Sequence, residues 1–257
     1  SGWTTREYGL DAHMGDFWPQ ILERYASMDA GKAETIRQNL QQLADFLETA
    51  ARNAESLADV RVAAIEAALG ARAHDMFSAE GIAQIGAARE RGMADVVDWI
   101  VSENGVTAST IIWTHNLHAA KSRFRMPALA DGYLTPLGVL LRQTYGAYYV
   151  AIGGTFGTGE YEEDLPPGGR RFAWPGTETI DGALARLGYA AVLLDLTNLG
   201  ELPRVADWLS EEREWRMQDS VAILSAGAGF DGNYFVDNIT RAPLTPLALQ
   251  RHTGGAD

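Results

Sequence analysis

The sequence contains no cysteine, which excludes disulfide bonds and thiolate metal sites. The absence of cysteine fits a reducing compartment, so we expect a cytoplasmic protein. No apolar run reaches the length of a membrane span. The first residues also lack the basic head and apolar core of a signal peptide. We therefore expect no membrane partner.

Basic residues are scarce as well. The chain has 21 Lys and Arg against 34 Asp and Glu, which gives a formal net charge of -13. Binding to a nucleic-acid backbone or to an anionic membrane surface needs clustered cations, so both partners are excluded. The sequence also lacks a Gly-x-Ser-x-Gly nucleophile elbow. A serine hydrolase of the usual α/β type is therefore not expected.

The overall composition is typical of an ordinary globular protein. The chain has 257 residues, of which 46% are hydrophobic, enough for a substantial core. We expect residues 1–257 to form a single domain or the C-terminal portion of a larger domain. Residues 1–105 are mainly helical in pattern, and residues 106–257 alternate between strands and helices. The predicted fold class is α/β, with a parallel-type sheet covered by helices and a largely helical N-terminal region.

The pattern of apolar residues locates the expected elements. Helical spacing predicts helices over residues 18–25, 36–47, 60–68 and 83–100, and shorter helices that begin at Thr135-Pro136 and span 179–187. Short β-branched or aromatic runs predict strands at 6–11, 109–113, 148–152, 190–194 and 234–236. The run at 109–113 is apolar enough to be a buried strand. Residues 155–176 read as a long loop, and residues 215–230 read as irregular with one apolar stretch at 221–224.

The segment His115-Asn116-Leu117-His118 follows directly on the run at 109–113. Open α/β sheets place their ligand crevices at the carboxyl ends of strands, so this position favours a functional site. Imidazole is the side chain most readily poised for proton transfer near neutral pH. Two imidazoles three residues apart can also bind one metal ion if the segment is helical. The alternative is a pair of histidines that are hydrogen-bonded at a strand end and carry no chemistry.

Other candidates surround this segment in the sequence. Arg89, on the helix at 83–100, could orient a polar substrate or a developing oxyanion, although a solvated helix face with local ion pairs is the more common arrangement. Trp113 could wall an apolar pocket, although filling the core is the more frequent role. The glycine-rich run at 153–159 lacks the lysine of a P-loop and leads into acidic residues, so it fits a rim or lid over a cleft. Phe156 and Glu160 of this rim are candidate substrate contacts, the latter toward an amine.

These segments, in this order, resemble the erythromycin esterase family. The resemblance rests on Arg89 to Ala94, on the strand-like run into His115-Asn116-Leu117-His118, on Pro136 to Leu141, on Tyr149 to Gly159 and on Phe230-Asp231-Gly232. It covers nearly the whole chain, and its specific part is His-Asn-x-His. The resemblance implies a hydrolase that opens macrolide lactones, with a histidine that activates water and no covalent intermediate. The resemblance implies that His115 and His118 lie in the active site. Arg89 matches the family's arginine less closely, because Glu90 stands where the family usually has aspartate.

One family motif is absent. The first part of the family carries Gly-Glu-x-x-His-Gly, which supplies the water-activating histidine, and this sequence has no such motif. The chain is then a fragment, one of two chains that form a site together, or a truncated product.

We predict an ester hydrolase with His115, His118 and Arg89 as catalytic residues and Asn116, Trp113, Phe156 and Glu160 as substrate contacts. Its partners would be a bulky ester such as a macrolide and the missing N-terminal section. No cofactor is required by this scheme. A metal-assisted hydrolase using a divalent metal ion, and a binding module without activity, are the alternatives.

Overall fold

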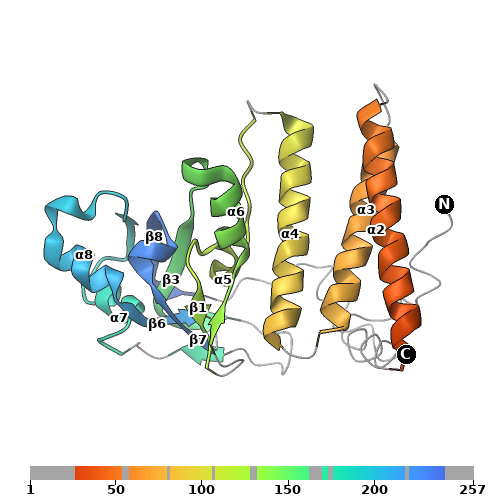
Figure 1. Cartoon of the computed structure of the whole chain (residues 1–257). Coiled ribbons are helices and arrows are strands. Elements are labelled where there is room, and N and C mark those ends of the chain that lie inside the picture. The colour runs from red at the N-terminus through yellow and green to blue at the C-terminus, as the bar shows by residue number, and fades with distance from the viewer. Residues whose placement is uncertain are drawn as a thin grey trace, which may run out of the picture. The chain divides into compact units, whose positions relative to one another are not determined.

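The computed structural model of the chain describes residues 27–53, 58–79, 82–105, 108–127, 132–161, 170–172, 176–217 and 220–240. The chain divides into two compact units (Figure 1). The helical unit contains residues 1–113 and 134–144, and the sheet unit contains residues 114–133 and 145–257. The architecture is mixed α and β with a helical N-terminal region, as predicted.

Three long helices dominate the helical unit. They are α2 (Ala30–Asn53), α3 (Ala58–Phe77) and α4 (Ile82–Asn104), and they confirm the helical spacing at 36–47, 60–68 and 83–100 (Figure 1). Alanines fill the positions between the helices, since small side chains let backbones approach closely; Ala44, Ala64, Ala67, Ala71 and Ala88 are buried. Among the described residues, no helix is both long enough and apolar enough to cross a membrane.

The short helix α6 (Leu137–Tyr145) begins directly after Thr135-Pro136, as predicted. Its first backbone N–H, on Leu137, donates a 2.7 Å hydrogen bond to Oε2 of Glu90 on α4. Glu90 is buried, with 8% of its surface exposed. The first turn of a helix has unsatisfied N–H groups and a positive dipole end, so a carboxylate there stabilises it. Glu90 therefore holds α6 to α4.

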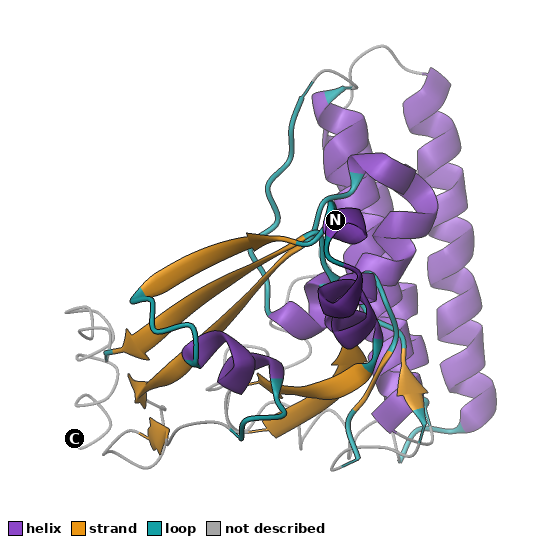
Figure 2. Cartoon of the chain, turned by 90° about the vertical axis from the view of Figure 1, so that its left-hand side faces the viewer, coloured by secondary structure: helices purple, strands orange, loops and turns teal. Residues whose placement is uncertain are grey.

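The described residues form two four-stranded sheets (Figure 2). In the first sheet the strands lie in the order β2 (Tyr133–Leu134), β1 (Phe124–Arg125), β7 (Ser220–Ser225) and β6 (Glu212–Met217). In the second sheet they lie in the order β4 (Arg170–Phe172), β3 (Ile152–Tyr161), β8 (Gly232–Ile239) and β5 (Ala191–Asp195). Strands β3 and β8 run parallel, and the β3–β4, β5–β8, β1–β7 and β6–β7 pairs are antiparallel. The expected parallel pairing is thus found at the centre of the second sheet, and the flanking pairings make that sheet mixed.

An aromatic cluster forms the core of the sheet unit. Trp215, Phe230 and Phe235 are each at most 1% exposed, and the ring centroids of Trp215 and Phe230 lie 4.7 Å apart. Burial of one such side chain contributes about 1.5–3 kcal/mol relative to leaving it in water. Trp215 packs directly on the backbone of Gly153, where an added Cβ would lie 2.7 Å from the indole ring. Glycine is therefore needed at position 153 for close packing.

Two apolar side chains on the opposite face of the sheet β4-β3-β8-β5 are exposed. Tyr234 on β8 lies beside Leu193 on β5 and Gly154 on β3. Leu193 is 66% exposed and Tyr234 is 48% exposed. Apolar side chains therefore lie on a solvent-facing sheet surface of a kind that soluble proteins usually cover.

The prediction of a buried strand at 109–113 was wrong. This run belongs to no strand, and Ile111 and Trp113 are 90% and 98% exposed. A strand requires a neighbour for its backbone hydrogen bonds, and none of the described strands pairs with this run. Trp113 therefore fills no core here.

Three further expectations were wrong. The expected loop at 155–176 contains most of β3 and all of β4, and the expected irregular stretch at 215–230 contains β7 and the end of β6. The strand expected at 148–152 begins only at Ile152, after a 3-10 turn over Gly146–Tyr148. The helix at 179–187 is confirmed as α7 (Ile180–Ala185), and the strands at 190–194 and 234–236 are confirmed as β5 and β8. The elements expected at 6–11 and 18–25 lie outside the described residues.

Candidate active site

The predicted histidine segment forms a single helical turn, α5 (Asn116–Ala119), at the start of the sheet unit. His115 is the N-cap residue, with extended backbone angles (φ −67°, ψ 147°). Its Nδ1 accepts a 3.2 Å hydrogen bond from the backbone N–H of Leu117. Ala120 closes the turn by donating its N–H to the carbonyl oxygen of Asn116 at 3.0 Å. His115 thus satisfies one of the N–H groups that a helix leaves free at its first turn.

Asn116 attaches this turn to β3. Its Nδ2 donates to the carbonyl oxygen of Gly154 at 2.5 Å, and its Oδ1 accepts from the N–H of Gly154 at 2.9 Å. One side-chain amide therefore pairs with both backbone groups of one residue, in the way that a neighbouring strand would. Through these two bonds, Asn116 positions the turn in this structure. Its predicted contact with substrate stays a prediction.

Asp231 links the residue that follows the C-cap of the turn to the residue just before β3. Its Oδ1 pairs with Nζ of Lys121 at 2.5 Å, and its Oδ2 accepts from the N–H of Ala151 at 2.8 Å. Tyr149 adds a third link by donating its hydroxyl hydrogen to the carbonyl oxygen of Ala119 at 2.7 Å. Burial, and then the negative charge of Asp231, raise the pKa of Tyr149 to about 12, so this hydroxyl stays a donor. Phe230-Asp231-Gly232 stood out in the sequence without an assigned role, and the structure shows that its aspartate supports the turn.

The two imidazoles lie close together on this fixed turn. The ring centroids of His115 and His118 are 6.5 Å apart, and the rings are inclined by 71°. Both side chains are partly exposed, so a small molecule can reach them. Burial, and then the charge of His118, lower the pKa of His115 below its ordinary value. A neutral imidazole near pH 7 can exchange protons or donate a hydrogen bond, which is what hydrolysis by a water molecule requires.

The other predicted site residues belong to other elements of the chain. Arg89 is exposed on α4 and belongs to the helical unit, and Trp113 is the last residue of that unit before the histidine turn. Phe156 lies on β3 with the guanidinium of Arg216 over its ring, 4.3 Å from the centroid. Glu160 lies near the end of β3, where its backbone pairs with Arg171, and its side chain is outside the described part of the chain. Among the predicted catalytic residues, the structure groups His115 with His118.

A buried polar cluster that sequence reasoning missed lies on the inner face of β3. Asp181 is fully buried, accepts a short hydrogen bond from the hydroxyl of Thr155 and accepts the N–H of Arg216 at 3.0 Å. The guanidinium of Arg216 donates to the carbonyl oxygens of Phe156 and Gly157. Burial raises the pKa of Asp181 above its ordinary value. The cluster joins α7, β3 and β6 by satisfying polar groups inside the unit.

Metal binding receives no support from the described residues. Within them, no three His, Asp or Glu side chains are grouped so that they could hold a metal ion. The two histidines of the turn would supply two ligands, whereas zinc sites use three or four protein ligands. The metal-assisted alternative therefore stays a prediction.

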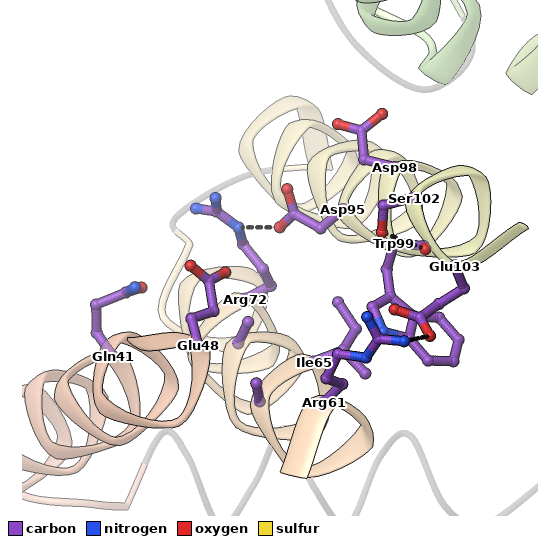
Figure 3. Close-up of a pocket in the computed structure, with 12 residues that line it drawn as sticks. Gln41, Glu48, Arg61, Ile65, Arg72, Asp95, Asp98, Trp99, Ser102 and Glu103 are labelled. Carbon is purple, nitrogen blue, oxygen red and sulfur yellow. Dashed lines mark hydrogen bonds and ion pairs between the residues drawn. The ribbon is translucent and has the colours of Figure 1, made fainter. Parts of the chain in front are cut away.

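The helical unit contains a separate groove of about 540 Å³ between α2, α3 and α4 (Figure 3). Two ion pairs cross it, Arg61 with Glu103 at 2.6 Å and Arg72 with Asp95 at 2.9 Å. Trp99 also lines the groove. None of the predicted site residues lines this groove, and its two arginines are held by carboxylates. We therefore centre the candidate site on the histidine turn.

The comparison with protein families decides the relationship. The erythromycin esterase family model matches residues 5–242, which is almost the entire chain and includes the histidine turn and β3. This chain belongs to the erythromycin esterase family. The family resemblance inferred from the residues is thereby confirmed. A comparison with curated protein sequences finds no match.

Solved structures of similar fold agree with this membership. A succinoglycan biosynthesis protein is 18% identical over 85% of this chain and 53% of its own, with a TM-score of 0.67. A Bacillus cereus protein is 17% identical over 85% of this chain and 55% of its own, with a TM-score of 0.68. The erythromycin esterase EreC, solved as a histidine-to-asparagine mutant in its open conformation, is 18% identical over 84% of this chain and 55% of its own, with a TM-score of 0.57. The chain spans about half the length of these relatives.

Proposed function

We propose that this chain carries the histidine pair of an ester hydrolase active site, and that the protein hydrolyses a bulky ester such as a macrolide lactone. The observation that carries the proposal is the turn from His115 to His118, which holds two partly exposed imidazoles 6.5 Å apart on a rigid support. Membership of the erythromycin esterase family points to a hydrolase of that kind. A role in resistance to macrolide antibiotics would follow from this activity.

The hydrogen bonds that anchor the turn support a catalytic role. Asn116 fixes the turn to Gly154, and Asp231 fixes Lys121 and Ala151 around it. Catalytic groups must be held in position before the substrate arrives, because positioning them during the reaction would add to the barrier.

The proposed reaction is direct attack by water. The water oxygen bonds to the ester carbonyl carbon while an imidazole accepts a water proton, and a tetrahedral intermediate with a negatively charged oxygen forms. The bond from carbonyl carbon to the ester oxygen then breaks, and the leaving oxygen takes up the proton. The products are a carboxylic acid and an alcohol, which stay in one molecule when the substrate is a lactone. Positioned acid–base groups contribute about 10²–10⁴-fold to such reactions.

Mass spectrometry of a substrate panel tests the proposal. The protein would be incubated with erythromycin, with a second macrolide and with open-chain esters, and the products would be separated by liquid chromatography. We expect at least one member of the panel to be hydrolysed: a macrolide would give a product heavier than its substrate by one water, and an open-chain ester would give its separate acid and alcohol. A parallel thermal-shift series would report binding, since a ligand that binds only the folded state raises the melting temperature. Stabilisation by macrolides without any hydrolysed product would replace the hydrolase with a binding module.

A further inference from the structure

Strand β5 (Ala191–Asp195) forms one edge of the sheet β4-β3-β8-β5. On the side toward β8, the carbonyl oxygen of Ala190 accepts from the N–H of Asp237, and the N–H of Leu196 donates to the carbonyl oxygen of Asp231. The backbone groups of successive residues in an antiparallel strand point alternately to its two sides. The residues that direct their N–H and C=O groups away from β8 are therefore Ala191, Leu193 and Asp195. Among the described strands, none pairs with this outer side.

The sequence of β5 leaves this edge open to pairing. Proteins usually protect sheet edges with charged side chains, proline or very short strands, because an unpaired edge accepts a further strand. The other edges of the two sheets have such protection: β4 begins with Arg170 and Arg171, β2 has two residues, and β6 carries two glutamates and two arginines. Strand β5 reads Ala-Val-Leu-Leu-Asp, so its one charge, Asp195, stands at its end. Leu193 at its centre is 66% exposed.

Strand β5 is complementary to a second copy of itself. Two such strands, related by a two-fold axis at Leu193, run antiparallel and overlap over all 5 residues. Each outward N–H of one strand then donates to an outward carbonyl oxygen of the other. Ala191 lies opposite Asp195 of the second copy, so no two carboxylates face each other. The two Leu193 side chains meet on the face where each is exposed, and their contact removes apolar surface from water.

We propose that this protein forms a symmetric dimer in which β5 pairs with β5 of a second copy and joins two four-stranded sheets into one continuous sheet. A second copy is the partner that the edge itself specifies, because the same strand supplies the matching length, the donors, the acceptors and the central leucine. Charge fixes the register, since a two-fold axis at Asp195 would set two carboxylates against each other. The dimer is independent of the proposed ester hydrolysis.

Size-exclusion chromatography with light scattering, over a range of protein concentrations, tests the dimer. We expect the wild-type protein to have twice the mass of one chain. Leu193→Lys removes two leucines from the interface and places two like charges at the axis, so we expect the Kd of the dimer to rise by roughly 100-fold or more. Val205→Lys is the matched control and should stay dimeric, because Val205 is an exposed apolar residue of α8 (Pro203–Ser210), outside β5. A wild-type protein that is monomeric at every concentration, or a Leu193→Lys variant that dimerises as tightly as wild type, would overturn the proposal.

Single cysteine substitutions test the pairing of the strands, since the chain contains no cysteine of its own. In the proposed dimer the two Cα atoms of Leu193 lie about 5.5 Å apart, whereas the two Cα atoms of Ala191 lie at least about 13 Å apart. A disulfide needs Cα atoms within about 7 Å of each other. Under mild oxidation we expect Leu193→Cys to form a disulfide-linked dimer and Ala191→Cys, at an exposed position of the same strand, to stay unlinked. Any other pattern, such as equal cross-linking of the two variants, would refute this pairing.

Discussion

Asn116 and Gly154 exchange two hydrogen bonds across 38 positions of sequence, at 2.5 Å and 2.9 Å. Through this pair, the histidine turn is anchored to a strand at the centre of the sheet. In the structure, Asn116 holds the turn that carries His115 and His118.

Asn116→Ala removes both of these bonds, and we expect it to lower the free energy of unfolding by roughly 1–3 kcal/mol, at about 0.5–1.5 kcal/mol for each hydrogen bond. Turnover should fall as well, because the imidazoles lose their support. Chemical denaturation and kcat/KM measure the two effects. Asn238→Ala is the matched control, since Asn238 makes one hydrogen bond, to Thr158, at an exposed position. Equal effects of the two substitutions on turnover would refute a positioning role for Asn116.

The neighbouring glycines of β3 should respond differently to alanine. An added Cβ at Gly153 would lie 2.7 Å from the ring of Trp215, whereas one at Gly154 meets no atom within 4 Å. We expect Gly153→Ala to destabilise the chain by about 1–3 kcal/mol through overpacking. Gly154→Ala should change stability by at most about 0.5 kcal/mol. Denaturant midpoints measure both, and a similar loss at both positions would mean that contact with Trp215 is not what requires glycine.

Asp181 should be needed for stability. Asp181→Ala leaves the hydroxyl of Thr155 and the N–H of Arg216 without their acceptor inside the unit, at a cost of about 1–3 kcal/mol for each group left unsatisfied. Asp181→Asn should cost less, because its oxygen can accept from Arg216 while its amide donates to Thr155. Denaturation near pH 7 compares the variants. If asparagine is as damaging as alanine, the carboxylate has a role beyond these two hydrogen bonds.

The stability of the chain should depend on pH through His115. Burial and the charge of His118 hold the pKa of His115 below 6.5, its value in an unfolded chain. Between these two pKa values the unfolded chain binds a proton that the folded chain does not, so acid favours unfolding. The contribution of His115 is thus fully present above pH 6.5 and is lost as pH falls through the folded-state pKa. The difference in unfolding free energy between wild type and His115→Gln, followed from pH 8 to pH 5, should shrink toward low pH. A difference that grows toward low pH would show the opposite pKa shift.

The sequence predicted the elements whose pattern is local. Helices α2, α3, α4 and α7 follow from the helical spacing of apolar residues. Strands β5 and β8 follow from short β-branched or aromatic runs. Such signals are contained within the element itself, so one sequence is sufficient to read them.

The errors occurred where distant residues determine the outcome. The glycines at 153–159 suggested a loop, since glycine weakens strands. In the structure they are strand residues, because β3 runs close to Trp215 and to β8, where an added Cβ at Gly157 would lie 2.5 Å from the carbonyl oxygen of Asp237. The run at 109–113 has the composition of a buried strand, yet composition cannot say whether a neighbouring strand is present. The pairing of Asn116 with Gly154 is likewise invisible until the chain is folded.

The turnover of His118→Gln on erythromycin tests the central claim most directly. His74→Gln is the matched control, because His74 is a buried histidine of the helical unit that contacts Ser78. With circular dichroism showing that both variants are folded, we expect His118→Gln to lose about 10²–10⁴-fold in kcat/KM. His74→Gln should hydrolyse erythromycin at the wild-type rate. Equal turnover by wild type and His118→Gln would show that the reaction centre of this protein lies elsewhere.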